Sequence, residues 1–113
     1  MITDKAKESI IQHLKTTYTR MQLGSGGDST NPSSTILDVP IQASIVNINA
    51  YETKNSIEFE GFINGSYLVG QNVKEVGILK NLGNELLCRI PFENLGPFTS
   101  TDSLEVNITM VVE

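Results

Sequence analysis

The sequence predicts a mainly β domain of the α+β class: an antiparallel β-sandwich of about six to eight strands with one N-terminal α-helix. Three observations lead to this prediction. One apolar stripe at helical spacing lies near the N-terminus, alternation of apolar and polar residues dominates from residue 39 onward, and short turn-forming segments separate the alternating runs. At 113 residues, the chain is expected to form a single domain that spans 1–113.

The first element is expected to be a helix over about residues 3–17. Thr3 fits the N-cap position, and Asp4 places a negative charge in the first helical turn. The β-branched residues Thr16 and Thr17 favour extended chain and predict where the helix ends. The apolar residues that form one stripe at helical spacing are Ala6, Ile10, Ile11, Leu14 and Tyr18.

A short half-buried strand follows, in which Met21 and Leu23 alternate with Arg20 and Gln22. The next segment, GSGGDSTNPSST at 24–35, is a polar, glycine-rich loop. Loops of about a dozen residues in a compact domain are usually functional or mobile, so we expect high mobility over 24–34 in the isolated protein. The candidate partner-contact residues of this loop are Gly24, Ser25, Gly26, Gly27, Asp28 and Asn31.

The β-sandwich itself is expected over 36–113, because apolar alternation returns there. Asn64-Gly65 predicts a hairpin turn that leads into the segment SYLV, and Pro91 and Pro97 bracket a second loop. The apolar residues that mark the strands are Val39 and Ile41; Val46, Ile48 and Ala50; Ile57, Phe59, Gly61 and Ile63; and Leu104, Val106, Ile108, Met110 and Val112.

The stretch VKEVGILKNLGNELLCRIPF, at 73–92, predicts a β-hairpin around the polar turn KNLGNE. Gly77 is expected to give room where another part of the chain approaches the backbone. The residues expected to face the core are Val76, Ile78, Leu86, Cys88 and Ile90.

Charge and composition argue against several classes of protein. The net charge is −5 and the eight basic residues are scattered, whereas a nucleic-acid-binding protein needs a clustered basic face. No apolar run approaches the ~20 residues that span a bilayer, and the opening MITDKAKESI is too charged for a signal peptide. The lone cysteine, Cys88, excludes an intrachain disulfide and is expected to be a small buried side chain. We therefore expect neither nucleic acid nor membrane as a partner.

No catalytic, cofactor or metal motif is found in the sequence. GSGGDST lacks the lysine of a phosphate-binding loop, and His13, the only histidine, has no second ligand of the kind that zinc sites use. Glu58 and Glu60 lie about 6–7 Å apart on one strand face, a spacing possible for paired catalytic carboxylates, but that face is expected to be solvated. We therefore expect no enzyme, no cofactor and no metal; a site built from Glu58, Glu60 and His13 is the third alternative.

Several segments, taken in order, resemble a domain of bacteriophage tail proteins. The chain opens with 2-ITDKAKESI-10, continues with 21-MQLGSGGDSTNPSSTIL-37 and ends with the alternating strand 104-LEVNITMVV-112. The most specific block comprises Val73, Glu75, Val76, Gly77, Ile78, Leu79, Gly83, Leu86, Leu87, Arg89, Ile90 and Phe92. In this order they resemble the N-terminal regions of tail-collar fibre proteins and related small baseplate components. Two departures from the family pattern are Val76 in place of Ile, and Ile78-Leu79 in place of Leu-Phe.

The resemblance implies a non-enzymatic virion component of the tail or baseplate, which acts in the assembly or attachment of tail fibres. It implies a homo-oligomer whose partners are other tail or baseplate proteins, made in the bacterial host cytoplasm and located in the virion. Since no fibre shaft follows Glu113, we expect a small tail or baseplate component or an adaptor rather than a fibre. The alternative is a receptor- or carbohydrate-binding module at a phage tail tip.

Overall fold

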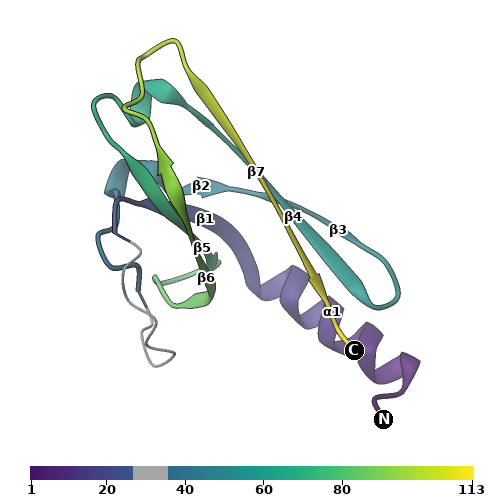
Figure 1. Cartoon of the computed structure of the whole chain (residues 1–113). Coiled ribbons are helices and arrows are strands. Elements are labelled where there is room, and N and C mark those ends of the chain that lie inside the picture. Colours follow the sequence, from purple (N-terminus) through teal and green to yellow (C-terminus); the bar gives the residue numbers. More distant parts are fainter. Residues whose placement is uncertain (27–35) are drawn as a thin grey trace.

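The computed structural model describes residues 1–26 and 36–113, and it confirms the predicted fold class (Figure 1). One helix precedes seven strands, which form two antiparallel sheets with the orders β2-β1-β5-β6 and β3-β4-β7. In the described part of the chain, no helix combines the length and apolar character needed to cross a membrane. The elements are α1 (Asp4–Thr17), β1 (Tyr18–Gly24), β2 (Val46–Asn47), β3 (Asn49–Glu52), β4 (Ser56–Asn64), β5 (Val73–Lys80), β6 (Leu86–Leu95) and β7 (Ser103–Val111), with 3-10 turns at Gln42–Ser44 and Gly65–Tyr67.

Helix α1 begins as predicted, because Thr3 Oγ1 accepts a hydrogen bond from the Ala6 N–H at 3.2 Å. The predicted apolar stripe, however, reaches the core only in its second half. Ile11 is fully buried and Leu14 packs against the core, whereas Ala6 and Ile10 are exposed. The prediction of one buried stripe is wrong for the first half of α1, which extends beyond the ends of the strands (Figure 1).

Strand β1 lies between β2 and β5, so the four-stranded sheet includes a segment outside the predicted range of 36–113. Met21 and Leu23 are fully buried, as expected, but Gln22 is buried as well, with 4% of its surface exposed. The prediction of a half-buried strand is therefore wrong at Gln22, because the polar face is covered there as well. The outer face of this sheet is covered by the segment 36–39, whose Leu37 is 1% exposed and lies against Gly77, the partner of Gln22 on β5.

The segment predicted as one strand through Val46, Ile48 and Ala50 is divided between the two sheets. β2 pairs with β1 and β3 pairs with β4, and Ile48 lies between them with its N–H donating to Thr19 O at 3.0 Å. All three apolar residues still pack against the core. The chain thus passes from one sheet to the other here, which connects the two sheets along this side.

The predicted hairpin turn at Asn64-Gly65 is wrong. β4 pairs with β3 and β7, and a 3-10 turn over Gly65–Tyr67 follows it instead of a returning strand. The Gly65 N–H donates to Asp102 O at 2.6 Å, and a Cβ at Gly65 would lie 2.3 Å from Thr99 O. The glycine therefore allows two backbone segments to approach closely, which is a long-range requirement that the local pattern does not reveal.

The alternating C-terminal segment is confirmed as strand β7. It pairs with β4 without a register shift from Ser103 to Val111. The predicted residues lie on its core side: Ile108 is buried, while Leu104, Val106 and Met110, together with Val112 directly after the strand, are half-buried and pack against the core.

The β5–β6 hairpin is also confirmed, with Val76 and Ile78 buried in the core. A register shift changes the face of one predicted core residue. Cys88 opposes Ile78 but Leu86 opposes Leu79, so Leu87 is an extra residue in β6. This bulge turns Leu86 to the outer face and Leu87 toward the core, because alternation is interrupted by one residue.

Two further predictions for β6 are corrected. Ile90 opposes Val76 on β5 but keeps 38% of its surface exposed, because β6 is an edge strand. Pro91 lies within β6 instead of beginning a loop, so the connection to β7 starts after Leu95. An edge strand accommodates proline because the missing N–H can face away from the neighbouring strand.

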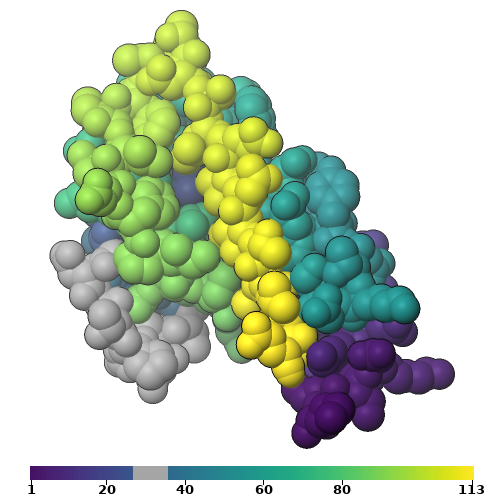
Figure 2. Space-filling model, turned by 45° about the vertical axis from the view of Figure 1, so that its right-hand side comes forward, coloured from purple at the N-terminus to yellow at the C-terminus, as the bar shows by residue number. Residues whose placement is uncertain are grey.

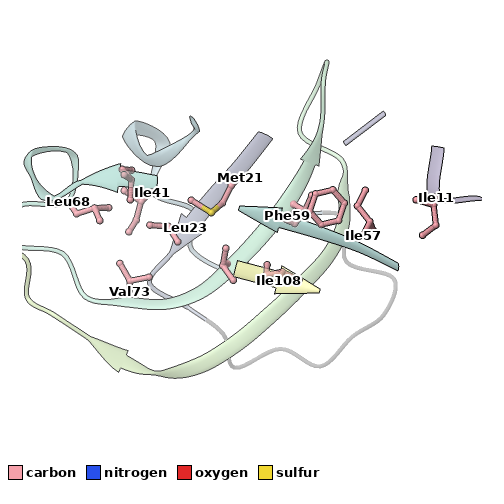
Figure 3. Close-up of a cluster of buried hydrophobic side chains, with 12 residues drawn as sticks. Ile11, Met21, Leu23, Ile41, Ile57, Phe59, Leu68, Val73 and Ile108 are labelled. Carbon is pink, nitrogen blue, oxygen red and sulfur yellow. The ribbon is translucent and has the colours of Figure 1, made fainter. Parts of the chain in front are cut away.

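The hydrophobic core lies between the two sheets and extends to α1. Figure 3 shows its side chains along the length of the sandwich, from Leu68 at one end to Ile11 of the helix at the other. The fully or almost fully buried members are Ile11, Met21, Leu23, Ile41, Ile57, Phe59, Ile63, Leu68, Val73, Val76, Ile78 and Ile108.

Candidate functional site

The two segments that flank residues 27–35 lie side by side at one end of the four-stranded sheet. Gly24 and Pro40 form an antiparallel β-bridge, and the Ser25 N–H donates to Val39 O at 2.9 Å. The Ile41 N–H donates to Leu23 O at the same distance. The predicted partner-contact loop is therefore anchored at both of its ends by backbone hydrogen bonds.

The structure places only part of the predicted contact loop. Gly27, Asp28 and Asn31 lie outside the described residues, as does most of the segment predicted to be mobile. Gly24 is the last residue of β1 and is buried, so the loop begins one residue later than predicted and Gly24 offers no surface to a partner in this structure. Ser25 and Gly26 are half-buried beside the returning segment.

A buried carboxylate lies directly beneath this anchor. Glu75, on the outer face of β5, is fully buried and stands opposite Gly24 in the register with β1. Its Oε1 accepts a hydrogen bond from the Val39 N–H at 3.1 Å, whereas its Oε2 is buried without a hydrogen-bond partner in the described chain. Glu75 therefore ties the segment that follows the loop to the central strand of the sheet.

The two glycines at the start of the loop leave the space that this carboxylate occupies. A Cβ at Gly24 would lie 2.3 Å from Glu75 Oε1, and a Cβ at Gly26 would lie 2.5 Å from Asp38 Cβ and 3.3 Å from Glu75 Oε1. No larger residue fits at either position without movement of its neighbours. The close packing of the anchor therefore favours glycine at both positions.

An ion pair and an apolar contact complete the anchor. Arg89 on β6 pairs with Asp38 at 3.0 Å, and both side chains are largely covered, with 11% and 22% of their surfaces exposed. Leu37 lies against Leu86 at the position of Gly77, where a Cβ would meet both leucine side chains. The Asp38–Arg89 ion pair, the hydrogen bond from the Val39 N–H to Glu75 and the buried Leu37 side chain therefore all help to hold residues 36–39 on the sheet.

In residues 1–26 and 36–113, no group of three or more His, Cys, Asp and Glu side chains is placed to hold a metal ion. Burial raises the pKa of the Cys88 thiol above its ordinary value, which keeps the thiol protonated at neutral pH.

The structure does not gather the residues of the third alternative into one cluster. Glu58 and Glu60 lie on the outer face of β4, where Glu60 Oε1 accepts a hydrogen bond from the Tyr51 hydroxyl at 3.5 Å. His13 is exposed on α1, and its Nδ1 lies 3.4 Å from Thr17 Oγ1. The described contacts of Glu60 and His13 are therefore with a neighbouring strand and with the next turn of the same helix, respectively.

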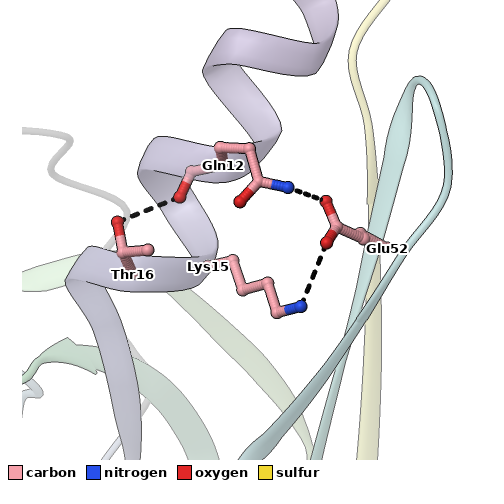
Figure 4. Close-up of polar contacts among 4 residues, drawn as sticks. All are labelled: Gln12, Lys15, Thr16 and Glu52. Carbon is pink, nitrogen blue, oxygen red and sulfur yellow. Dashed lines mark hydrogen bonds and ion pairs between the residues drawn. The ribbon is translucent and has the colours of Figure 1, made fainter.

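A second polar contact joins the helix to the smaller sheet (Figure 4). Gln12 Nε2 and Lys15 Nζ both donate to the carboxylate of Glu52 on β3, the latter at 3.0 Å. Hydrogen bonds from Lys15 and Gln12 lower the pKa of Glu52 below its ordinary value. Because these groups are exposed, the contact orients α1 and adds little to stability.

An open groove of about 520 Å³ lies beside the anchored loop. Tyr67 and Val69, each 56% exposed, and Val39, 52% exposed, contribute its apolar surface. Polar groups that line it come from Ser25, Gln42, Ser66 and Gln71. This groove joins one flank of the loop to the connection between β4 and β5.

The sequence reasoning missed both the buried carboxylate and the groove. The run Val76-Gly77-Ile78-Leu79 is apolar on both faces, a pattern typical of a strand covered on both sides, and it indicates that Glu75 is buried too. No comparable local signal marks Tyr67 or Gln71 as groove residues, because the groove forms between distant segments. No protein-family model matches the chain, and no curated protein is significantly similar to it.

Proposed function

We propose that this chain is a non-enzymatic structural component of a bacteriophage tail or baseplate, which acts in assembly or in the attachment of tail fibres. Its partners are other virion proteins and further copies of the chain. The resemblance in motif order supports this proposal, and one structural observation carries it furthest. Three residues of the resembling block lie against the segment 36–39, which follows the polar loop.

Three of the four polar or glycine positions of that block have a contact at the loop anchor, and the fourth, Gly83, lies in the turn of the β5–β6 hairpin. Glu75 binds the backbone of Val39, Arg89 pairs with Asp38, and Gly77 makes room for Leu37. A chain that devotes its buried polar groups to fixing the ends of a loop is suited to present that loop to a partner. A reaction centre would instead need such groups to converge on a cavity.

The experiment replaces residues 27–35 by a Gly-Ser linker of equal length in the virus that encodes the chain. We expect purified tails to contain the wild-type chain and to lose the linker variant, as measured by mass spectrometry of the tail fraction. The matched control replaces the exposed hairpin turn 81–84, which lies away from the loop anchor, and should leave incorporation unchanged. Absence of the wild-type chain from purified tails would contradict the proposal.

The groove favours one alternative, a receptor- or carbohydrate-binding module at a tail tip. An exposed tyrosine ring beside amide and hydroxyl groups, as at Tyr67, Gln42 and Gln71, is a surface on which a sugar ring can stack and form hydrogen bonds. Titration with host-surface oligosaccharides decides the matter: binding that Tyr67→Ala abolishes supports the alternative. Tyr51→Ala, an equally exposed tyrosine on β3, is the control. No binding by the wild-type chain excludes this alternative for the saccharides tested.

A further inference from the structure

The strand β7 is the one described edge of the sandwich that is both long and unprotected. The other edge of its sheet, β3, spans four residues, and β2 spans two. The remaining edge strand, β6, contains Pro91 and two register shifts. β7 spans nine residues in continuous register and contains no proline, glycine or basic residue. Natural sheets usually block such an edge, because it offers unpaired backbone groups to another strand.

The pairing with β4 determines which backbone groups of β7 face this open edge. The Gly65 N–H donates to Asp102 O at 2.6 Å, and the Val112 N–H donates to Asn55 O at 2.8 Å, so even-numbered residues bond to the β4 side at both ends. In an antiparallel strand, successive residues point their backbone N–H and C=O groups to opposite sides of the strand. The odd-numbered residues of β7 therefore direct these groups away from β4. These residues are Ser103, Glu105, Asn107, Thr109 and Val111.

The side chains of β7 also leave apolar surface at this edge. Leu104, Val106 and Met110 face the core but are only half-buried. In Figure 2, β7 (yellow) runs along the surface for its full length, with a hollow between it and β6 (green). A strand added to β7 would bury the outward backbone groups and these side chains together.

We propose that a second copy of this chain binds there, through antiparallel pairing of β7 with β7 about a two-fold axis at Asn107. In this register Asn107 faces its own copy and Glu105 faces Thr109. The core-side residues pair as Leu104 with Met110 and Val106 with Ile108. Apolar side chains therefore meet apolar ones on the core face. On the outer face polar side chains meet polar ones in the middle of the pairing, and Ser103 faces Val111 at each end.

Charge favours a two-fold axis at Asn107 over one that is shifted by two residues to Glu105. Glu105 is the only charged residue of β7, and an axis at Glu105 would place two carboxylates opposite each other. With the axis at Asn107, the outward groups of both copies form about ten hydrogen bonds, two for each pair of facing odd-numbered residues. The two three-stranded sheets become one continuous six-stranded sheet, β3-β4-β7-β7-β4-β3. This pairing gives a specific contact to the homo-oligomer of the proposed function.

The test measures self-association by sedimentation equilibrium over about a hundredfold range of concentration. Asn107→Lys places two lysines opposite each other and should raise the dissociation constant at least about tenfold. Asn107→Glu should have the same effect, and an equimolar mixture of the two variants should associate again as a heterodimer. Asn107→Pro removes an outward N–H and leaves the bonds to β4 intact, so it should give a folded monomer.

The matched control is Asn49→Lys, which should associate as the wild type does. Asn49 and Asn107 flank Glu60 on the same sheet face, but Asn49 lies on β3. A monomeric wild-type chain at every concentration overturns the proposal, and so does an oligomer that is equally sensitive to Asn49→Lys and Asn107→Lys. Circular dichroism confirms the folding of each variant, and any one folded variant at 107 is sufficient for the decision. Presence of the chain in purified tails is a separate result, so failure of β7 pairing and failure of the virion role are distinguishable.

Discussion

A fully buried carboxylate needs hydrogen-bond donors within the fold, because burial removes the water that would otherwise solvate it. Glu75 has one such donor in the Val39 N–H, and its second oxygen has none in the described chain. A buried carboxylate with one unpaired oxygen adds little net free energy to folding. Its main effect is to fix the position of the group that it binds. At this residue, the partner is the segment that returns from the polar loop.

Replacement of Glu75 should reveal this anchoring role. Glu75→Ala leaves the Val39 N–H unpaired and opens a cavity, so it should lower the free energy of unfolding by about 1–3 kcal/mol in urea denaturation. Glu75→Gln keeps one carbonyl oxygen for Val39 in a side chain of nearly the same shape, so its effect should be within about 1 kcal/mol. Amide hydrogen exchange at Val39 should accelerate in Glu75→Ala.

The control for Glu75 is Glu85→Ala, at the exposed end of the hairpin. Glu85 pairs with Lys80 at 3.1 Å and is 58% exposed, so its loss should cost no more than about 0.5 kcal/mol. If the two alanine variants unfold at the same urea concentration, Glu75 does not hold the segment at 36–39.

Glu52 should make a pH-dependent contribution to the attachment of α1. Its pKa is lowered in the folded protein by Lys15 and Gln12, so the contact contributes above the unfolded pKa of about 4.3 and is lost as pH falls through the lowered value. An NMR titration should show a higher pKa for Glu52 in Lys15→Met than in the wild type, while the hydrogen bond from Gln12 still lowers it in part. A titration of Glu52 that is unchanged in this variant would show that Lys15 is not the cause.

At the scale of elements, α1 is attached through one side and one half only. Ile11 is fully buried in the core, while the neighbouring Ile10 is 40% exposed. Ile11→Ala should therefore cost about 2–5 kcal/mol, and Ile10→Ala about 0.5 kcal/mol or less beyond the difference in helix propensity. Thermal denaturation of the two variants measures this contrast. Equal losses would mean that the exposed half of α1 is packed in solution.

Elements that depend on neighbours in sequence could be predicted from the sequence. The N-cap at Thr3, the hairpin around Gly83 and the alternating strand β7 each have a complete local signal, and each was predicted correctly. Elements that depend on contacts between distant parts of the chain could not be predicted from the sequence. The apparent turn at Gly65 is a close approach to the connection before β7, and the bulge at Leu87 changes the face of Leu86.

The candidate site divides in the same way. Composition marks 24–35 as a loop, but only the folded sheet brings Ser25 beside Val39 and places Glu75 beneath them. The burial of Gln22 has the same origin. Its partner on β5, Gly77, lies against Leu37, which the loop separates from Gln22 in the sequence. Alternation of apolar and polar residues predicts the face of the sheet on which each side chain lies. It does not predict whether another segment of the chain covers that face.

At the scale of the whole molecule, one hydrophobic core links every principal element. Ile11 of α1, Met21 of β1, Phe59 of β4, Ile78 of β5 and Ile108 of β7 belong to the same cluster. Neither sheet could keep its inner face covered if the other unfolded, because each supplies the other's contacts. The two sheets and the second half of the helix should therefore unfold as one unit.

This cooperativity is testable with two independent probes. Far-UV circular dichroism reports the backbone. In a chain that has no tryptophan, tyrosine fluorescence reports tertiary contacts, mainly those of Tyr18, because Tyr51 and Tyr67 are more than half exposed. We expect both probes to give the same midpoint and the same slope in urea, as in a two-state transition. Because Tyr18 packs where α1 joins β1, its environment changes only if that junction opens. An earlier transition in the tyrosine signal would show that α1 detaches before the sheets unfold, and the core would then consist of the two sheets alone.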